Sequence, residues 1–106
     1  MVARGDIWLV ALNPTVGSEI QKTRPCIIVS PEQINRSGRT FLVAPMTTGS
    51  HPAPFRPPVA FQGKTGFILA DQIRTVDRKR LIKRLGHIDD VALKKLLATL
   101  REMFAP

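Results

Sequence analysis

Apolar residues occur in short runs along most of the chain, and turn residues separate these runs. Glycine, proline, asparagine and serine bound them, which is typical of β-strands rather than of long helices. The stretch Gln62 to Thr65, between two such runs, resembles a hairpin connection. The predicted strands are Ile7 to Leu12, Pro25 to Ser30, Thr40 to Ala44, Val59 to Phe61 and Gly66 to Ala70.

The pattern becomes more charged after residue 70. Here the sequence predicts a strand over Ile73 to Val76, a helical turn over Asp77 to Arg80 and another strand over Leu81 to Leu85. The stretch Arg74 to Arg84 holds six cations and one acid. Two interpretations are equally consistent with it: a face that binds nucleic-acid phosphates, or a solvated edge whose charges prevent edge-to-edge strand pairing.

The C-terminal residues have the spacing of a helix. Asp89 or Asp90 suits the N-cap of a helix from Val91 to Phe104. Five apolar residues then recur at i, i+3, i+4, i+7 and i+11, on one face: Leu93, Leu96, Leu97, Leu100 and Phe104.

Short strands followed by one amphipathic helix predict a mainly β fold of the α+β class. We expect a small, strongly bent antiparallel sheet or partly open barrel with the helix packed on it. At 106 residues the chain has room for one small core, so residues 1–106 are predicted to form a single domain.

Two polar stretches are predicted to be loops. One runs from Pro31 to Gly38. The other, Thr47 to Pro58, holds too many prolines for a strand or a helix. Its Phe55 is expected to pack onto the core, and a polyproline segment offered to a partner is the alternative.

Charge is the strongest signal in the composition. The chain has 16 Lys and Arg against 8 Asp and Glu, which gives a net charge of +8. An excess of this sign favours a polyanionic partner, such as nucleic acid, an acidic membrane surface or an acidic protein. A small basic domain can also carry such charge for solubility alone. With no apolar run of membrane-spanning length, the sequence predicts a cytoplasmic protein outside the membrane.

The sequence predicts neither a metal site nor a cofactor. His51 and His87 have no partners at the spacing of metal ligands. The chain also lacks a glycine-rich phosphate loop or dinucleotide motif. Its single cysteine, Cys26, lies within an Ile/Val run, where a buried and unreactive thiol is expected.

Polar residues at the ends of predicted strands are the candidates for chemistry. Pro25 restricts Arg24 to extended conformations just before a strand. Thr47 and Thr48 follow the strand that ends at Pro45. The pair Asp71 and Gln72 closes a third strand. In a small barrel these groups can converge on one surface, although any one of them alone equally suits a cap or a turn.

Such a set suits cleavage of RNA without a metal. The 2′-OH attacks its own phosphate, so the protein must accept one proton, supply another and stabilise charge on the phosphoryl oxygens. Arg24 suits the last task, because its planar fork binds two phosphate oxygens. Thr47 can add an oriented donor, and either Asp71 or Glu19 can act as the base.

Three segments give the sequence a family resemblance. RGDIWLVALNPTVGSEIQKTRPCIIVSP, VAPMTT and ADQIRTVDRKRL, in that order and before a terminal helix, resemble the MazF/PemK/Kid toxin endoribonucleases. The resemblance implies an SH3-like barrel of the PemK type that acts as a homodimer. It implies metal-independent cleavage of single-stranded mRNA, leaving 2′,3′-cyclic phosphate and 5′-OH ends. It also implies an antitoxin whose acidic, largely disordered tail covers the RNA groove.

The family's motifs assign roles to particular residues here. The arginine of the RP pair is Arg24, and the threonine after VAP-x is Thr47. Glu19, in GSE, and Asp71, in ADQ, match further residues that act in catalysis in relatives. The residues expected to contact RNA are Gln21, Lys22, Thr48, Gln72 and Arg74.

Two positions depart from the Kid-like pattern and favour the pair Arg24 and Thr47. Leu69 stands where Kid-like members have a second arginine, and Ser18 stands where they have a histidine. Two alternatives remain at this point. One is a CcdB-like toxin that binds DNA gyrase without cleaving RNA, and the other is a barrel that binds RNA without cutting it.

Overall fold

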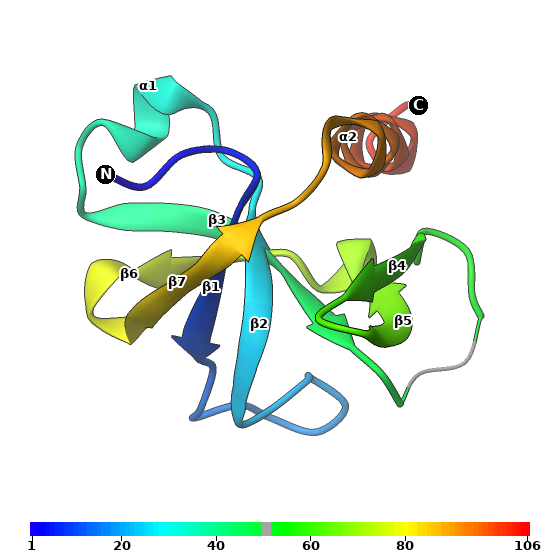
Figure 1. Ribbon diagram of the computed structural model, residues 1–106, viewed down its shortest axis with the longest axis horizontal. Helices are drawn as coiled ribbons and strands as arrows, with labels where there is room; N and C mark the ends of the chain where they lie inside the picture. The colour runs from blue at the N-terminus through cyan, green and yellow to red at the C-terminus, as the bar shows by residue number, and fades with distance from the viewer. Residues whose placement is uncertain (50–51) are drawn as a thin grey trace.

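The computed structural model describes residues 1–49 and 52–106, and their strands form a curled antiparallel sheet (Figure 1). His51, considered above as a metal ligand, lies outside the described residues. Two helices, α1 (Glu32–Asn35) and α2 (Asp90–Met103), and two 3-10 turns, η1 (Ala70–Gln72) and η2 (Arg78–Arg80), accompany the strands. The strands are β1 (Asp6–Ala11), β2 (Thr23–Ile28), β3 (Thr40–Thr47), β4 (Pro58–Phe61), β5 (Lys64–Ile68), β6 (Arg74–Asp77) and β7 (Leu81–His87).

The sheet order explains the partly open barrel. Strands run β4-β5-β3-β2-β1-β7, and β6 pairs with the first half of β3. Strands β6 and β7 follow each other through η2, yet they pair with β3 and β1 at opposite edges. Because the short turn η2 connects strands at the two edges, those edges must lie close together, and this requires a strongly bent sheet. The predicted fold class is therefore confirmed.

Strand β3 continues past Pro45, where the sequence predicted its end. Its residues Thr40 to Val43 pair with β6, and Met46 and Thr47 pair with β5. Pro45 lies between these segments, and its carbonyl accepts a hydrogen bond from Leu69 N at 2.8 Å. In a β-strand the N–H and C=O of one residue point to the same side. The N–H that Pro45 lacks would therefore point to the side on which β3 changes its partner from β6 to β5. Proline is tolerated there.

Strand β2 begins earlier than predicted, so Arg24 lies within the strand and not before it. Its first residues pair only with β1, with Arg24 opposite Val10, and pairing with β3 starts at Cys26. Pro25 thus lies on a locally unpaired edge, where its missing N–H costs no ladder hydrogen bond. The beginning of β2 is paired on one side only, and Arg24 is half-buried there.

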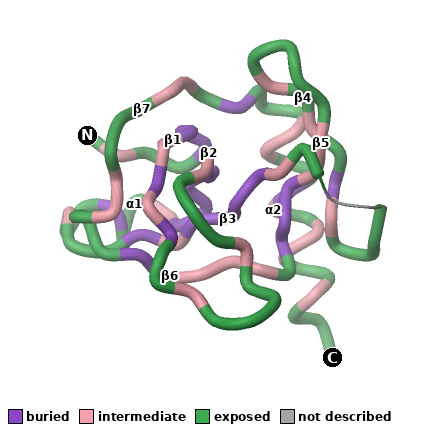
Figure 2. Tube along the Cα trace, turned by 90° about the horizontal axis from the view of Figure 1, so that it is seen from below, coloured by how far each residue is buried: buried purple, intermediate pink, exposed green. Residues whose placement is uncertain are grey.

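The core consists of two clusters, one on each face of the sheet. Ile27 of β2 joins the cluster under α2, whose Leu96 is fully buried. Cys26 and Ile28 point to the opposite cluster, with Phe41 and others. This alternation follows from the two-residue period of a strand. Figure 2 shows the buried positions gathered along β1, β2 and β3, with exposed loops around them.

The other sequence predictions vary in their accuracy. Helix α2 is capped by Asp89, whose side chain accepts from Ala92 N at 2.8 Å, as predicted. The strand, turn and strand expected after residue 72 are present as β6, η2 and β7. The predicted loop Pro31 to Gly38 is wrong in part, because α1 forms there. Phe55 does not pack onto the core as expected, since it remains 40% exposed.

No helix in the described part of the chain is long and apolar enough to cross a membrane.

Candidate active site

The predicted convergence of strand-end residues is present in part, because Asp71 lines a separate, adjoining depression. Arg24 of β2, Thr47 at the end of β3, Thr48 after it and Gln72 of η1 all line one open depression. These residues are far apart in sequence, and the curled sheet brings them together. The lining of this depression therefore includes residues that carry a guanidinium, two hydroxyls and an amide.

The loop before β2 fixes the orientation of Arg24. Its Nε donates to the carbonyl of Gln21 at 3.1 Å. Lys22 has a positive φ of 73° and is held by two hydrogen bonds. Its N–H donates to Asn13 Oδ1 at 3.0 Å, and its carbonyl accepts from Leu12 N at 3.0 Å. Gln21 and Lys22 are exposed on this loop, where their side chains can meet a ligand.

Thr47 is positioned by a close backbone approach. A Cβ added at Gly66 would lie 2.0 Å from the carbonyl oxygen of Thr47, which no side chain can tolerate. Glycine at this position therefore lets β5 approach the end of β3. The Thr47 hydroxyl accepts from Gly49 N at 3.2 Å.

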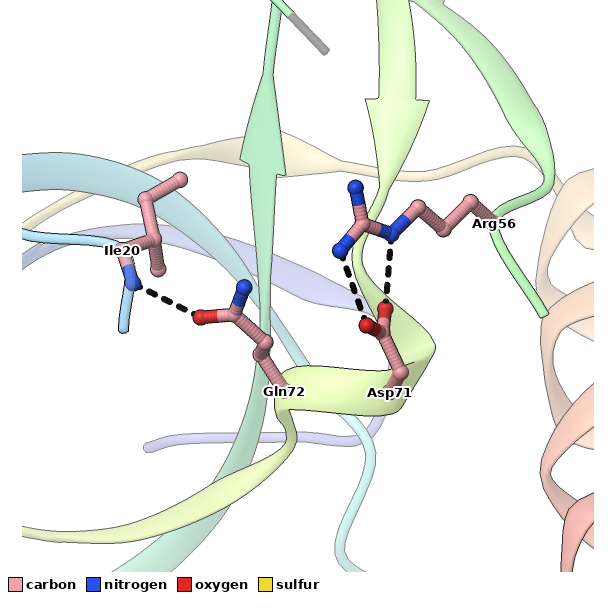
Figure 3. A network of polar contacts seen from close by, with 4 residues as sticks. All are labelled: Ile20, Arg56, Asp71 and Gln72. Atoms are coloured by element: carbon pink, nitrogen blue, oxygen red, sulfur yellow. Dashed lines mark hydrogen bonds and ion pairs between the residues drawn. The ribbon is translucent and has the colours of Figure 1, made fainter. Parts of the chain in front are cut away.

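Turn η1 attaches two loops beside the depression (Figure 3). Gln72 Oε1 accepts from Ile20 N at 2.7 Å, which fixes the loop between β1 and β2. Asp71 accepts two hydrogen bonds from Arg56, from Nε at 3.0 Å and Nη2 at 2.8 Å. This second contact holds Arg56, just before β4, against the turn. One short turn therefore anchors a segment from each of two loops.

Asp71 is a strongly engaged carboxylate. The hydrogen bond from Arg56 lowers the pKa of Asp71 below its ordinary value, so the group stays ionised. Both of its oxygens are bound to the same guanidinium, in the bidentate geometry typical of arginine. Sequence reasoning missed Arg56, although this residue also lines the depression. No local pattern indicates it, because its partner is 15 residues further along the chain.

Glu19 lies beside the depression rather than within it. Its neighbours Ser18 and Ile20 line the depression, whereas Glu19 lines an adjoining one together with Asp71 and Gln72. Glu19 Oε1 accepts from Val16 N at 2.7 Å, and the residue is exposed. One carboxylate oxygen thus anchors the loop.

Arginines of the basic stretch brace the main chain. Arg74 Nη1 donates to the carbonyl of Leu12 at 3.0 Å, although Arg74 also lines the depression beside Glu19. Arg80 Nη1 donates to the carbonyls of Ala11 at 3.0 Å and Asn13 at 2.6 Å. These contacts hold the end of β1 and the start of the following loop. Bracing the main chain is a role that neither interpretation of the basic stretch, as a phosphate-binding face or as a solvated edge, included.

Cys26 takes no part in the depression. It is fully buried, and burial raises the pKa of its thiol to about 12. The thiolate that a nucleophile requires is therefore absent at neutral pH. Within residues 1–49 and 52–106, no group of three or more His, Cys, Asp or Glu side chains is arranged to hold a metal ion.

Comparison with known proteins identifies the family. Residues 3–104 match the model of the PemK-like, MazF-like toxins of type II toxin–antitoxin systems. The chain belongs to this family. The resemblance inferred from the sequence motifs is thereby confirmed.

Two relatives have been named for their activity. Endoribonuclease PemK of Escherichia coli is 41% identical over 105 residues, which is 92% of this chain and 77% of the relative. Endoribonuclease EndoA of Bacillus subtilis is 35% identical over 102 residues, which is 91% of this chain and 88% of the relative. These similarities support the predicted toxin endoribonuclease and not the gyrase-binding alternative.

Solved structures share the fold. Crystalline MazF from Deinococcus radiodurans matches with a TM-score of 0.85 and 24% identity, over 96% of this chain and 94% of that one. A mycobacterial endoribonuclease in complex with its cognate antitoxin matches with a TM-score of 0.82 and 22% identity, over 100% and 98% of the two chains.

Proposed function

We propose that this PemK/MazF-family toxin cleaves single-stranded mRNA at short sequence motifs, without a metal ion. The observation that carries the proposal is the meeting of Arg24, Thr47 and Gln72 in one depression. In the proposed step the 2′-OH loses its proton to a base and its oxygen forms a bond to phosphorus, while the bond from phosphorus to the 5′-oxygen breaks and that oxygen takes up a proton from water. The products are a 2′,3′-cyclic phosphate and a 5′-OH.

Arg24 and Thr47 act on the phosphate in this proposal. An arginine side chain stays protonated, so Arg24 stabilises the negative charge that gathers on the phosphoryl oxygens and does not act as a base. Its hydrogen bond to the Gln21 carbonyl supports this role, because it fixes the guanidinium in advance. The Thr47 hydroxyl adds an oriented donor at the end of β3.

Glu19 is the better candidate for the base that accepts the 2′-OH proton. Asp71 has both oxygens bound to Arg56, and the lowered pKa makes its carboxylate a weaker base. Glu19 uses one oxygen to hold Val16 N. Asp71 then serves mainly to position the loop that carries Arg56.

RNA contacts extend around the depression. Thr48 and Gln72 line it, and Gln21 and Lys22 are exposed on the loop beside Arg24. Arg74 lies further away, where it both braces Leu12 and borders the Glu19 depression. The net charge of +8 favours RNA and an acidic protein alike.

The proposed biological context is that of the family. Residues 1–106 act as one domain in a cytoplasmic homodimer, and an antitoxin with an acidic, disordered tail inhibits the toxin by covering the RNA site. The mycobacterial endoribonuclease, solved with its cognate antitoxin, supports such a partner.

Product analysis in EDTA tests the proposal. A long single-stranded RNA of mixed sequence should give discrete cuts with 5′-OH and 2′,3′-cyclic phosphate ends. Arg24→Ala should abolish them, whereas Arg36→Ala should not. Arg36 is a suitable control because it is an exposed arginine next to α1 and pairs only loosely with Glu32, at 3.4 Å.

Two outcomes would overturn the proposal. RNA that stays intact across many sequences while it binds in a salt-dependent way would indicate an RNA-binding barrel instead. Cleavage at an undiminished rate by Arg24→Ala would exclude the assigned chemistry.

A further inference from the structure

A second pocket shares Arg24 and Thr47 with the candidate active site. Its volume is about 240 Å³, and the β4–β5 hairpin forms its other wall. The hairpin contributes Phe61, Gln62 and Lys64 to this wall. None of these three residues has a role in the proposed cleavage step.

The hairpin turn carries an unusual residue. Gln62 and Gly63 form a two-residue turn, with φ values of 51° and 75°. Turns of this type favour asparagine or glycine at the first position, because a longer side chain is strained at positive φ. A glutamine at this position places a long amide side chain at the pocket, although its positive φ strains the backbone of the turn. Backbone strain of this kind is often associated with function.

The pocket wall has the chemistry of a nucleobase site. Phe61 offers apolar aromatic surface, the Gln62 amide can both donate and accept, and Lys64 carries a charge suited to a phosphate. At about 240 Å³ the pocket has room for a single base.

The location of the pocket indicates which nucleotide of the RNA strand supplies the bound base. A phosphate held by Arg24 and Thr47 has a nucleotide on either side of it. Because these two residues also line the pocket, a flanking base reaches it without any break in the RNA strand.

We propose that the β4–β5 pocket binds one base flanking the scissile phosphate, and that Gln62 hydrogen-bonds to the edge of that base. Lys64 binds a neighbouring phosphate. The pocket is then a specificity subsite of the toxin. This inference rests on the proposed function, since it takes Arg24 and Thr47 as the site of cleavage.

Gln62→Gly is the sharpest variant for a test. Glycine removes the amide and relieves the positive φ, so the fold should be at least as stable as that of the wild type. Cuts in a random-sequence RNA pool are mapped for both proteins. At one position flanking the cut, Gln62→Gly should lose about tenfold or more of its base preference, while the other positions keep theirs. Gln33→Ala, an exposed glutamine of α1, should change no position.

Lys64 provides a second, binding-based measurement. The affinity for a 2′-O-methylated single strand, which cannot be cleaved, is measured at several salt concentrations. Affinity falls as salt rises, and Lys64→Ala should make this fall less steep, by about 0.7 in the slope of log affinity against log salt. Lys95→Ala, an exposed lysine of α2, should leave it unchanged.

The results separate this inference from the proposed function. If the wild type cuts RNA and Gln62→Gly keeps every base preference, the subsite is wrong and the cleavage proposal stands. A lower rate with unchanged preferences also excludes the subsite, because it reports a merely structural role. If the wild type cuts no RNA, both proposals fail together.

Discussion

The two ends of strand β2 lie in different environments. The strand begins at Thr23, beside the open depression. Just beyond its other end lies Ser30, which has no exposed surface. At the first end, Arg24 is half-buried and lines two pockets. At the second end, Ser30 Oγ donates to Asn35 Oδ1 at 2.5 Å, and Asn35 Nδ2 donates to the Ser30 carbonyl at 2.8 Å. Leu42 N completes the group by donating to Ser30 Oγ at 3.1 Å.

The comparison separates polar residues that hold the fold from those that can act on a ligand. Ser30 and Asn35 satisfy each other in a dry environment, where an unpaired partner would cost free energy. Arg24 and Thr47 instead keep part of their surface in a depression. The two ends should therefore respond differently to substitution: in stability at the Ser30 end and in RNA cleavage at the Arg24 end.

Gly66→Ala should give the largest combined effect, because it changes the backbone of the Arg24 end. Its new Cβ would lie 2.0 Å from the Thr47 carbonyl, so β3 or β5 must shift. We expect a loss of about 1–3 kcal/mol in the free energy of unfolding, together with the loss of cleavage by the molecules that remain folded. Urea unfolding and cleavage of a fixed RNA measure the two effects.

Gly86→Ala is the matched control for this change. It also places a Cβ in a strand, but the nearest atom, Phe61 Cε1, is 3.6 Å away, an ordinary contact. It should retain both stability and activity. Equal activity in Gly66→Ala and the wild type would contradict the assigned position of Thr47.

Asn35→Ala should affect stability alone. It leaves Ser30 without its partner in a buried site, which costs about 1–3 kcal/mol. Cleavage per folded molecule should equal that of the wild type, and Gln33→Ala on the same helix should match the wild type in both measurements. A cleavage defect in fully folded Asn35→Ala would remove the distinction between the two ends of β2.

Asp71→Asn should have the smallest effect on stability. At neutral pH the partly exposed ion pair with Arg56 contributes about 0.2–1 kcal/mol. Because Arg56 lowers the pKa of Asp71, the contribution is complete above the ordinary aspartate pKa of about 3.9 and is lost as the pH falls towards the folded value.

Unfolding free energies of the wild type and Asp71→Asn, compared at pH 7 and at pH 3, test this dependence. The difference between the two proteins should shrink at the lower pH. A difference that grows on acidification would contradict the ion pair as its cause.

The sequence predicted local structure well where one physical rule dominated. The cap at Asp89 and the spacing of Leu93 to Phe104 identify α2, and short apolar runs identify most strands. It failed where tertiary pairing overrode a local signal. Pro45 lies inside β3 because the strand changes partner there, and no local pattern reveals that change.

The candidate site was predictable to a similar degree. Strand-end polarity and family motifs selected Arg24, Thr47 and Gln72, which the fold brings together. The contact between Arg56 and Asp71 was not predictable, because it depends on how a long loop returns to η1. Nor was the bracing role of Arg80, whose carbonyl partners lie 67 and 69 residues away.

The central claim is that the planar fork of Arg24 holds the scissile phosphoryl group. The most direct test is the single-turnover rate of RNA cleavage by Arg24→Lys at saturating enzyme, in EDTA. Lysine keeps the charge and loses the fork, so the rate should fall by about a hundredfold while the affinity for a 2′-O-methylated strand stays close to that of the wild type. A rate within about twofold of the wild type would contradict the claim.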